Sequence, residues 1–529
     1  MTGGGLYILV AYGSQNIILS GNPDFTYFYT VLKKYSHFSF ESATLQVDGP
    51  QELFFDQPIQ IRAKIQRIGD LLSDLYFTFT LPDIYSKFVK TNQPGPRYLG
   101  TQYEFQWVRY IGAQIIQDAS FYVGGSLIQQ IDSDYIIASA LTDQDETQYN
   151  KWQQLVGDVP ELYDPANGKY SGELGNTYMR TPGLYPNVNT TDTTSPQANF
   201  PSIPGRDITV PLGFWFSQNP NLALPLIALQ YHECEVQLTL RPIRDLYTVL
   251  DVTGHGRVRP GNSIVATTAQ LQTGNVTYAP NSDPGVLLNN FLTDYGYTIP
   301  TLSTWPLNAR LQATYVYLTE DERRTFASKS LSYLVRQVTR YPFSNNSTRQ
   351  YFELFTHNPV PRIIVIPRRS DAILGRNAWT NYTNWWLYPS APFVPNIALD
   401  TGVANTYGFS GQLVPGIQED IIRQMRILCD GNEIQEIKPA QYFKELSSWK
   451  YATGVFPPGL AIYSFALHTS NWMKPSGSLN TSRVKMFQID IDMWPLAADS
   501  NFLMDYVIYV ESLNFFVVEG GMGGMKYAI

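Results

Sequence analysis

Two closely spaced carboxylates are the first residues of this chain that could do chemistry. Asp490 and Asp492 could form the acid pair that flanks a sugar bond in a glycosidase. They alternate with Ile489 and Ile491, however, so in a strand both would point to the face opposite the isoleucines. We therefore interpret them as solvated strand residues and not as a catalytic pair.

A second acidic group has the composition of a calcium loop. Asp143, Asp145 and Glu146 lie close together, but the segment lacks the glycine and the terminal glutamate of an EF-hand. The sequence favours a solvated polar turn at this place.

Histidine and cysteine do not occur in metal-binding patterns. The five histidines are scattered without H-x-x-x-H spacing, and His232 is interpreted as a structural residue. Cys234 and Cys429 are predicted to be buried free thiols, with a disulfide between them as the alternative. Since neither a G-x-x-x-x-G-K phosphate loop nor a G-x-S-x-G turn is present, we expect no enzyme activity, no metal and no cofactor.

N-x-S/T tripeptides are the remaining candidate sites, because they can accept a glycan on an exposed loop. The candidate acceptors are Asn189, Asn275, Asn345, Asn346 and Asn381, while Asn480 is assigned to the fold. Tryptophans and tyrosines between 379 and 388 could form a sugar-binding platform, but we interpret them as a packing cluster.

The composition indicates an all-β protein with a large core. The chain has 529 residues, of which 14% are aromatic and only 16% are charged, so a disordered or coiled-coil chain is excluded. The net charge of -8, without a basic arm, argues against direct nucleic-acid binding. No apolar run is long enough for a membrane span, and we expect a soluble chain without a signal peptide.

Alternating apolar and polar residues predict strands, and helix signals are few. Strands are expected at 59–66, 75–81, 236–240, 311–317 and 484–493, the last with a bulge near Phe487. A helix is predicted at 23–32 behind a cap at Asn22. A second helix with a capping box is predicted from Thr319, and we interpret it as a linker between the two strand-rich halves of the chain.

The second half of the chain repeats landmarks of the first half in the same order. Val123–Ile131 matches Cys429–Ile437, and both read as hairpins with a turn glycine, Gly125 or Gly431. Tyr315-Val-Tyr317 likewise matches Tyr506-Val-Ile508. The distances between matched landmarks shrink along the chain, so the first half must carry two extra stretches, 157–207 and 242–306. The sequence therefore predicts two homologous β barrels.

Several segments resemble the major capsid proteins of nucleocytoplasmic large DNA viruses, of the chlorella-virus and iridovirus type. The matching segments are Leu9–Gln15, Leu19–Pro23, Phe216–Pro220 with Ala223–Glu233, Pro475–Arg483 and Gly521–Ala528. They span both halves and both ends of the chain in the order of that family.

The resemblance implies an all-β double jelly roll, which is two consecutive eight-stranded jelly-roll barrels with a short linker helix and long surface loops. The expected division is an N-terminal arm at 1–30, a first barrel at 31–319, a linker at 320–333 and a second barrel at 334–529.

The function that the resemblance implies is that of a major capsid protein. Three copies would form a pseudo-hexagonal capsomer, and capsomers would tile an icosahedral shell assembled in the host cytoplasm. The partners would be other copies and minor capsid proteins, with the arm near an inner membrane and the outer loops facing the host. A minor or penton capsid protein is the alternative, and a β-sandwich carbohydrate-active enzyme is an alternative of a different class.

Overall fold

Strands form where the sequence alternates apolar and polar residues. In β3 (Ile59–Lys64) every apolar side chain is buried and every polar one is exposed. The strands expected at 75–81, 236–240 and 311–317 lie within β4, β9 and β15. The computed structural model describes residues 3–30, 32, 34–86, 103–168, 185–186, 201–251, 255–292, 301–390, 418–470 and 474–527.

The first barrel consists of two four-stranded sheets. One sheet has the order β1 (Phe38–Leu45), β15 (Arg310–Leu318), β4 (Leu71–Leu81) and β8 (Arg206–Pro211). The other has the order β3, β9 (Cys234–Leu240), β6 (Ile116–Val123) and β7 (Ser126–Asp132). All of these neighbours pair antiparallel.

The second barrel repeats this arrangement. One sheet has the order β16 (Leu331–Asn346), β25 (Met504–Glu519), β19 (Arg362–Arg369) and β22 (Ala461–Ser464), and β26 (Met522–Met525) pairs with β25. The other has the order β17 (Gln350–Glu353), β24 (Phe487–Met493), β20 (Ile422–Cys429) and β21 (Asn432–Pro439).

Strand order shows that the two barrels have the same topology. In each barrel the first, eighth, third and sixth strands form one sheet, and the second, seventh, fourth and fifth form the other. This order is the jelly roll, in which two packed sheets are filled from alternate strands. The predicted all-β double jelly roll is confirmed.

Short elements connect and cover the barrels. The short strands are β2 (Glu52–Leu53), β5 (Phe105–Trp107), β10 (Tyr247–Leu250), β11 (Arg257–Val258), β12 (Asn262–Val265), β13 (Thr277–Pro280), β14 (Trp305–Pro306), β18 (Pro359–Val360) and β23 (Leu479–Asn480). The α-helices are α1 (Gly4–Val10), α2 (Ser14–Ser20), α3 (Ile111–Ile115), α4 (Ser133–Asp143), α5 (Glu146–Val156), α6 (Pro160–Tyr163), α7 (Thr268–Thr273), α8 (Glu320–Ser328), α9 (Ser370–Arg376) and α10 (Ser447–Tyr451). In the described part of the chain, no helix has the length and apolar character that crossing a membrane requires.

The sheet of the second barrel that contains β19 is buried on both faces. Ile363 and Val365 point into the core of the second barrel. Ile364 and Ile366, which point the other way, join the core cluster of the first barrel. The apolar run of β19 is continuous because one face fills its own barrel and the other packs against its neighbour.

The two predicted hairpins correspond closely. Gly125 and Gly431 both have positive φ in two-residue turns, as the repeat predicted. Both hairpins also shift register at matching points, so Ile128 in β7 and Ile434 in β21 are the extra residues of equivalent bulges. The hairpin match in the sequence repeat therefore reflects a structural repeat.

Two local predictions were wrong. No helix begins behind Asn22; the helices of the arm are α1 and α2, and the residues from 22 to 30 form turns, bends and irregular backbone. The bulge expected near Phe487 is absent from β24, because that strand begins at Phe487 and the register shift lies on β20, between Ile422 and Gln424. The helix after Thr319 does form, but without the side-chain capping bond.

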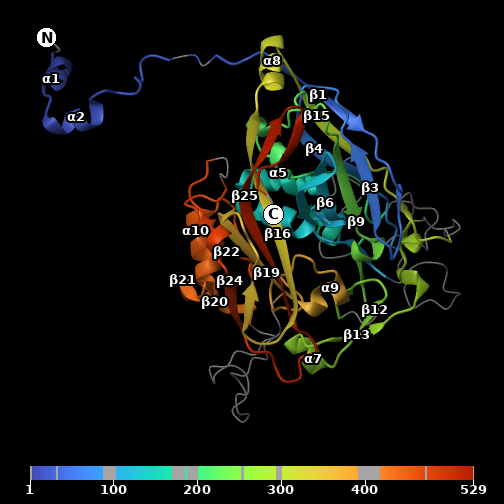
Figure 1. Cartoon of the computed structure of the whole chain (residues 1–529). Coiled ribbons are helices and arrows are strands. Elements are labelled where there is room, and N and C mark those ends of the chain that lie inside the picture. Colours follow the sequence, from blue (N-terminus) through green and yellow to red (C-terminus); the bar gives the residue numbers. More distant parts are fainter. Residues whose placement is uncertain are drawn as a thin grey trace.

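The N-terminal arm extends away from both barrels (Figure 1). Neither α1 nor α2 has a buried residue. Large apolar side chains such as Leu9, Ile18 and Phe28 are exposed along it. At 1–30 the sequence has Asp24 as its sole charged side chain, so the described part of this segment exposes a largely uncharged surface with many apolar side chains.

Candidate functional site

The contact between the two barrels contains a group of buried charged residues. From the first barrel, β7 leads into α4, and the side chain of Asp132 caps this helix by accepting a hydrogen bond from the Tyr135 amide at 2.9 Å. Acidic residues at both ends of α4 then face arginines on β16 and β19 of the second barrel. We call this region the inter-barrel site.

One half of the inter-barrel site is an ion network in which Arg336, Arg362 and Glu511 are buried and Asp143 is partly exposed. The guanidinium of Arg362 donates to Glu511 at 3.0 and 2.5 Å and to Asp143 at 2.5 Å. Arg336 lies within 3.1 Å of Asp143 and 3.2 Å of Glu511. The Tyr135 hydroxyl completes the network by donating to Glu511 at 2.8 Å. Four arginine–carboxylate contacts, in which Arg336 and Arg362 each contact both Asp143 and Glu511, fix the relative position of α4, β16, β19 and β25.

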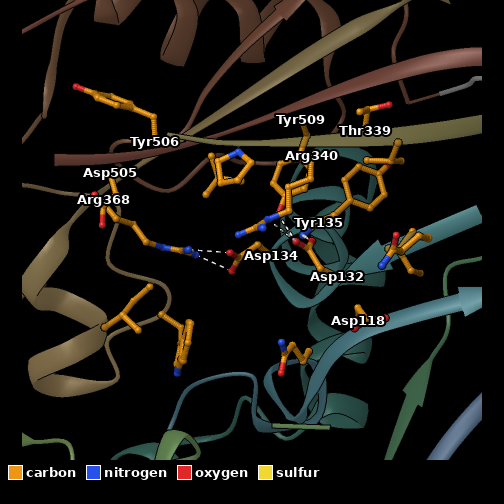
Figure 2. A pocket seen from close by; sticks show the side chains of 18 of the residues that line it. Asp118, Asp132, Asp134, Tyr135, Thr339, Arg340, Arg368, Asp505, Tyr506 and Tyr509 are labelled. Carbon is orange, nitrogen blue, oxygen red and sulfur yellow. Dashed lines mark hydrogen bonds and ion pairs between the residues drawn. The ribbon is translucent and has the colours of Figure 1, made fainter. Parts of the chain in front are cut away.

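The other half lines a polar pocket of about 660 Å³ between the barrels. Arg368 binds Asp134 through two hydrogen bonds of 2.7 and 2.6 Å. Arg340 lies 3.0 Å from Asp132, which also accepts a hydrogen bond of 2.6 Å from the Tyr509 hydroxyl. Figure 2 shows Arg368 directed at Asp134 and Arg340 directed at Asp132 across this pocket.

The electrostatics keep most of these groups charged. Burial opposes ionisation of Asp143, but the charges of Arg362 and Arg336 outweigh it and hold the pKa of Asp143 below its ordinary value. Burial likewise opposes ionisation of Asp134, and Arg368 lowers its pKa. For Asp132, burial and then the negative charge of Asp134 raise the pKa.

The ion pairs of the inter-barrel site, which we call the clasp, hold the two barrels together and do not form a catalytic centre. The Asp134 and Asp143 carboxylates are paired with arginines. Burial, and to a smaller extent the charge of Glu511, raises the pKa of the Tyr135 hydroxyl, so this hydroxyl is a poor proton donor. Buried ion pairs of this kind favour one docking geometry over others, since any displacement leaves a buried charge unpaired.

Two carboxylate predictions need correction. Asp143 is not in a solvated turn but in the buried network, and Asp145 caps α5 by accepting from the Gln148 amide. Asp490 and Asp492 do point away from the barrel core, but they are buried under arginines and not solvated. In both cases the covering side chains come from distant segments.

The structure places the sequons in different environments. The side-chain amides of Asn275, Asn346 and Asn381 are buried and donate to backbone carbonyls, which leaves no free nitrogen for a sugar in the folded chain. Asn345 is exposed. Asn189 lies outside the described residues. Glycosylation itself stays a prediction.

The other candidates have structural roles. Trp379, Tyr382 and Trp386 are buried, as expected for packing residues, while Trp385 and Tyr388 are half-buried and their rings lie 6.4 Å apart. Among the described residues no three histidine, cysteine or acidic side chains gather as a metal site. Cys234 is buried and Cys429 is half-buried, both as free thiols, and burial raises the pKa of Cys234 to about 12.

His232 holds the C-terminal hairpin to the first barrel. Its Nδ1 lies 3.2 Å from the Gly523 amide and 3.0 Å from the Gly523 carbonyl oxygen. Arg67 supports the same segment by donating to the carbonyls of Gln230 and His232. The resemblance block 223–233 is thus the place where the chain's end meets its first half.

The residues that sequence reasoning missed are the arginines of the inter-barrel site. Arg362 and Arg368 flank the apolar run 363–367 of β19, and the whole strand is buried. A charged residue inside a strand that is apolar on both faces has to be paired, and this signal could have identified them.

With fold and site in place, the chain can be compared with known proteins. Two jelly rolls of matching topology, clasped in one chain, define the class of double jelly-roll capsid proteins. Residues 26–295 match the family model described as the major capsid protein N-terminus, and residues 322–524 match the large eukaryotic DNA virus major capsid protein.

Relatives and solved structures agree with these matches. The major capsid protein of Paramecium bursaria Chlorella virus 1 is 25% identical over 558 residues, covering 99% of each chain. That of Phaeocystis pouchetii virus is 24% identical over 590 residues, again covering 99% of each. The quasi-atomic model of the PBCV-1 capsid has a TM-score of 0.61 at 18% identity, covering 95% of this chain and 100% of the other. The Faustovirus major capsid protein has a TM-score of 0.59 at 14% identity, covering 97% and 96%.

The chain belongs to the family of major capsid proteins of large eukaryotic DNA viruses. It is a structural protein of the virion capsid and not an enzyme, so the carbohydrate-active alternative is excluded.

Proposed function

We propose that three copies of this chain form a closed capsomer with six similar lobes, and that such capsomers tile an icosahedral shell. The observation that carries this proposal is the identical strand order of the two barrels. A chain that presents two similar lobes lets threefold association imitate sixfold symmetry, which suits a nearly hexagonal lattice.

The parts of the chain have distinct places in this proposal. The division is the arm at 1–30, the first barrel at 31–319, the linker at 320–333 and the second barrel at 334–529. The exposed apolar arm, which has no partner within its own described chain, would contact minor capsid proteins beneath the shell, close to an inner membrane. Assembly in the host cytoplasm and host contact by the outer loops belong to the same proposal.

Light scattering coupled to size-exclusion chromatography tests the capsomer. The expected mass is three times that of one chain, because interfaces between lobes of this size are obligate in character. A monomer at high protein concentration would overturn the capsomer, and a five-chain ring would favour the penton alternative.

A further inference from the structure

No described residue of the first barrel covers the β21 and α10 surface of the second barrel, although the counterpart of this surface in the first barrel is covered. Ile128 and Ile131 of β7 are each 2% exposed, whereas the matching Ile434 and Ile437 of β21 are 39% and 40% exposed. The two isoleucine pairs occupy the same positions of equivalent hairpins.

The cover over β7 is the second barrel. The side chain of Gln337 on β16 donates to the Ile128 carbonyl at 3.3 Å, and Gln129 donates to the Arg336 carbonyl at 3.2 Å. On β21 the corresponding Gln435 donates only to its neighbour Glu436 among the described contacts. The β7 surface of the first barrel and the β21 surface of the second barrel are thus equivalent, but only the β7 surface has a contact within the described chain.

We propose that this uncovered surface of the second barrel docks on the β1–β15 sheet of the first barrel in the next copy of the chain. The inference rests on the proposed capsomer and deepens it, because it names the two faces that meet. The contact inside the chain serves as the template for the contact between chains.

The receiving face is exposed on the first barrel at β1, while Phe326 of α8 packs over Val316 and Leu318 of β15 beside it. Phe38 and Phe40 of β1 are 43% and 59% exposed, and their rings form an edge-to-face pair. They lie directly across from Leu318 and Val316 of β15. On the second barrel the equivalent face is the one that packs against β7 and α4.

Aligning the repeats shows a change of chemistry between the two contacts. When Gly125 is aligned with Gly431, Asp132 falls on Lys438, and the helical segment that follows the hairpin as α4 follows β7 contains Trp449, which is 82% exposed. When Tyr315 is aligned with Tyr506, Leu318 falls on Tyr509, and the strand register then places Phe38 where Arg340 stands. An acid–arginine contact inside the chain thus becomes a lysine–aromatic contact between chains.

The second barrel of another copy cannot receive the β21 surface on the equivalent face. Arg336, Arg340 and Arg362 of that face are already paired with carboxylates of the first barrel in their own chain. In the proposed ring, first and second barrels therefore alternate.

The first experiment compares two sets of exposed residues in the full-length chain. In the double variant Ile434→Glu/Ile437→Glu we expect the mass by light scattering to fall from three chains to one, with unchanged circular dichroism. The matched control is Val265→Glu, an exposed aliphatic residue on strand β12, which should remain trimeric. A double variant that stays trimeric overturns the docking surface.

The second experiment does not depend on a destabilising change. Phe38→Cys and Lys438→Cys are combined in one chain and treated with a short bifunctional thiol cross-linker. Denaturing gels should show covalent dimers and trimers for the double variant and not for either single variant. The single variants also show whether the native thiol of Cys429 takes part in cross-linking. A trimer without these cross-links overturns the docking surface and leaves the capsomer intact, whereas a monomeric wild type overturns the capsomer itself.

Discussion

At the scale of single residues, Arg362 links the two barrels directly. It is fully buried and contacts carboxylates from both barrels, Asp143 from the first and Glu511 from the second. Without Arg362, Arg336 would be the one arginine left in contact with both Asp143 and Glu511 among the ion pairs described. Removing one partner of a buried pair costs far more than the pair contributes, because the remaining charge has no water.

Replacing Arg362 tests this role. Arg362→Ala should lower the apparent free energy of unfolding by about 3–5 kcal/mol in urea titrations. Arg324→Ala is the control: this arginine pairs with Glu320 on the exposed face of α8, and its loss should cost less than about 1 kcal/mol. Equal effects of the two variants would contradict the clasp.

The sequence could not reveal this site, because its members are far apart in the chain. Asp143 looks like a turn residue beside Asp145 until Arg336 and Arg362 are brought onto it. Asp490 was correctly placed on the outer face of its strand, but the arginines that cover it come from another strand and a loop. Periodicity predicts the direction of a side chain and says nothing about what lies over it.

At the scale of elements, the two adjacent glycines in the turn between β6 and β7 have different structural roles. Gly124 and Gly125 both have positive φ, at 57° and 80°. A Cβ on Gly125 would meet nothing within 4 Å, whereas a Cβ on Gly124 would lie 2.7 Å from the ring of His232. The first glycine therefore allows the turn and also makes room for the histidine that holds Gly523.

Two alanine variants separate these roles. Gly125→Ala should cost about 1–2 kcal/mol, the penalty of the left-handed conformation alone. Gly124→Ala should cost more and should also speed amide hydrogen exchange in β26, because His232 would be displaced from Gly523. Exchange measured by mass spectrometry distinguishes them, and unchanged exchange in Gly124→Ala would contradict the role of His232.

Elements were predictable where their stability is local. The alternation in β3, β4, β9 and β15 and the turn glycines of both hairpins report contacts within a sheet. The helix expected behind Asn22 has the right periodicity, but its apolar side has no core to pack against, and amphipathic helices depend mainly on that packing. The topology of each barrel came from the resemblance, since periodicity does not determine strand order.

At the scale of the whole molecule, the clasp makes the union of the barrels sensitive to acid. The folded state holds the pKa of Asp143 below its ordinary value, so folding favours the ionised carboxylate. This contribution is complete above the unfolded pKa of about 4 and is lost as the pH falls through the lower pKa of the folded state.

The variant Asp143→Asn isolates that contribution. At neutral pH it should be less stable than the wild type in urea titrations, and the difference should shrink as the pH is lowered below about 4. Asp207→Asn removes an exposed carboxylate on β8 and should show little difference at either pH. A difference for Asp143→Asn that is independent of pH would mean that the carboxylate charge is not what joins the barrels.

Joining two barrels by α8 in one polypeptide also changes how the proposed ring responds to dilution. Within each chain one lobe-to-lobe contact is intramolecular, so it forms at a high effective concentration whatever the amount of protein present. Only alternate contacts around the ring then require an encounter between molecules. At equilibrium the concentration of rings would rise with the third power of the free chain concentration, whereas a ring of six separate barrels would follow the sixth power of the free barrel concentration. Rings would therefore persist on dilution to protein concentrations at which rings of single-barrel subunits fall apart.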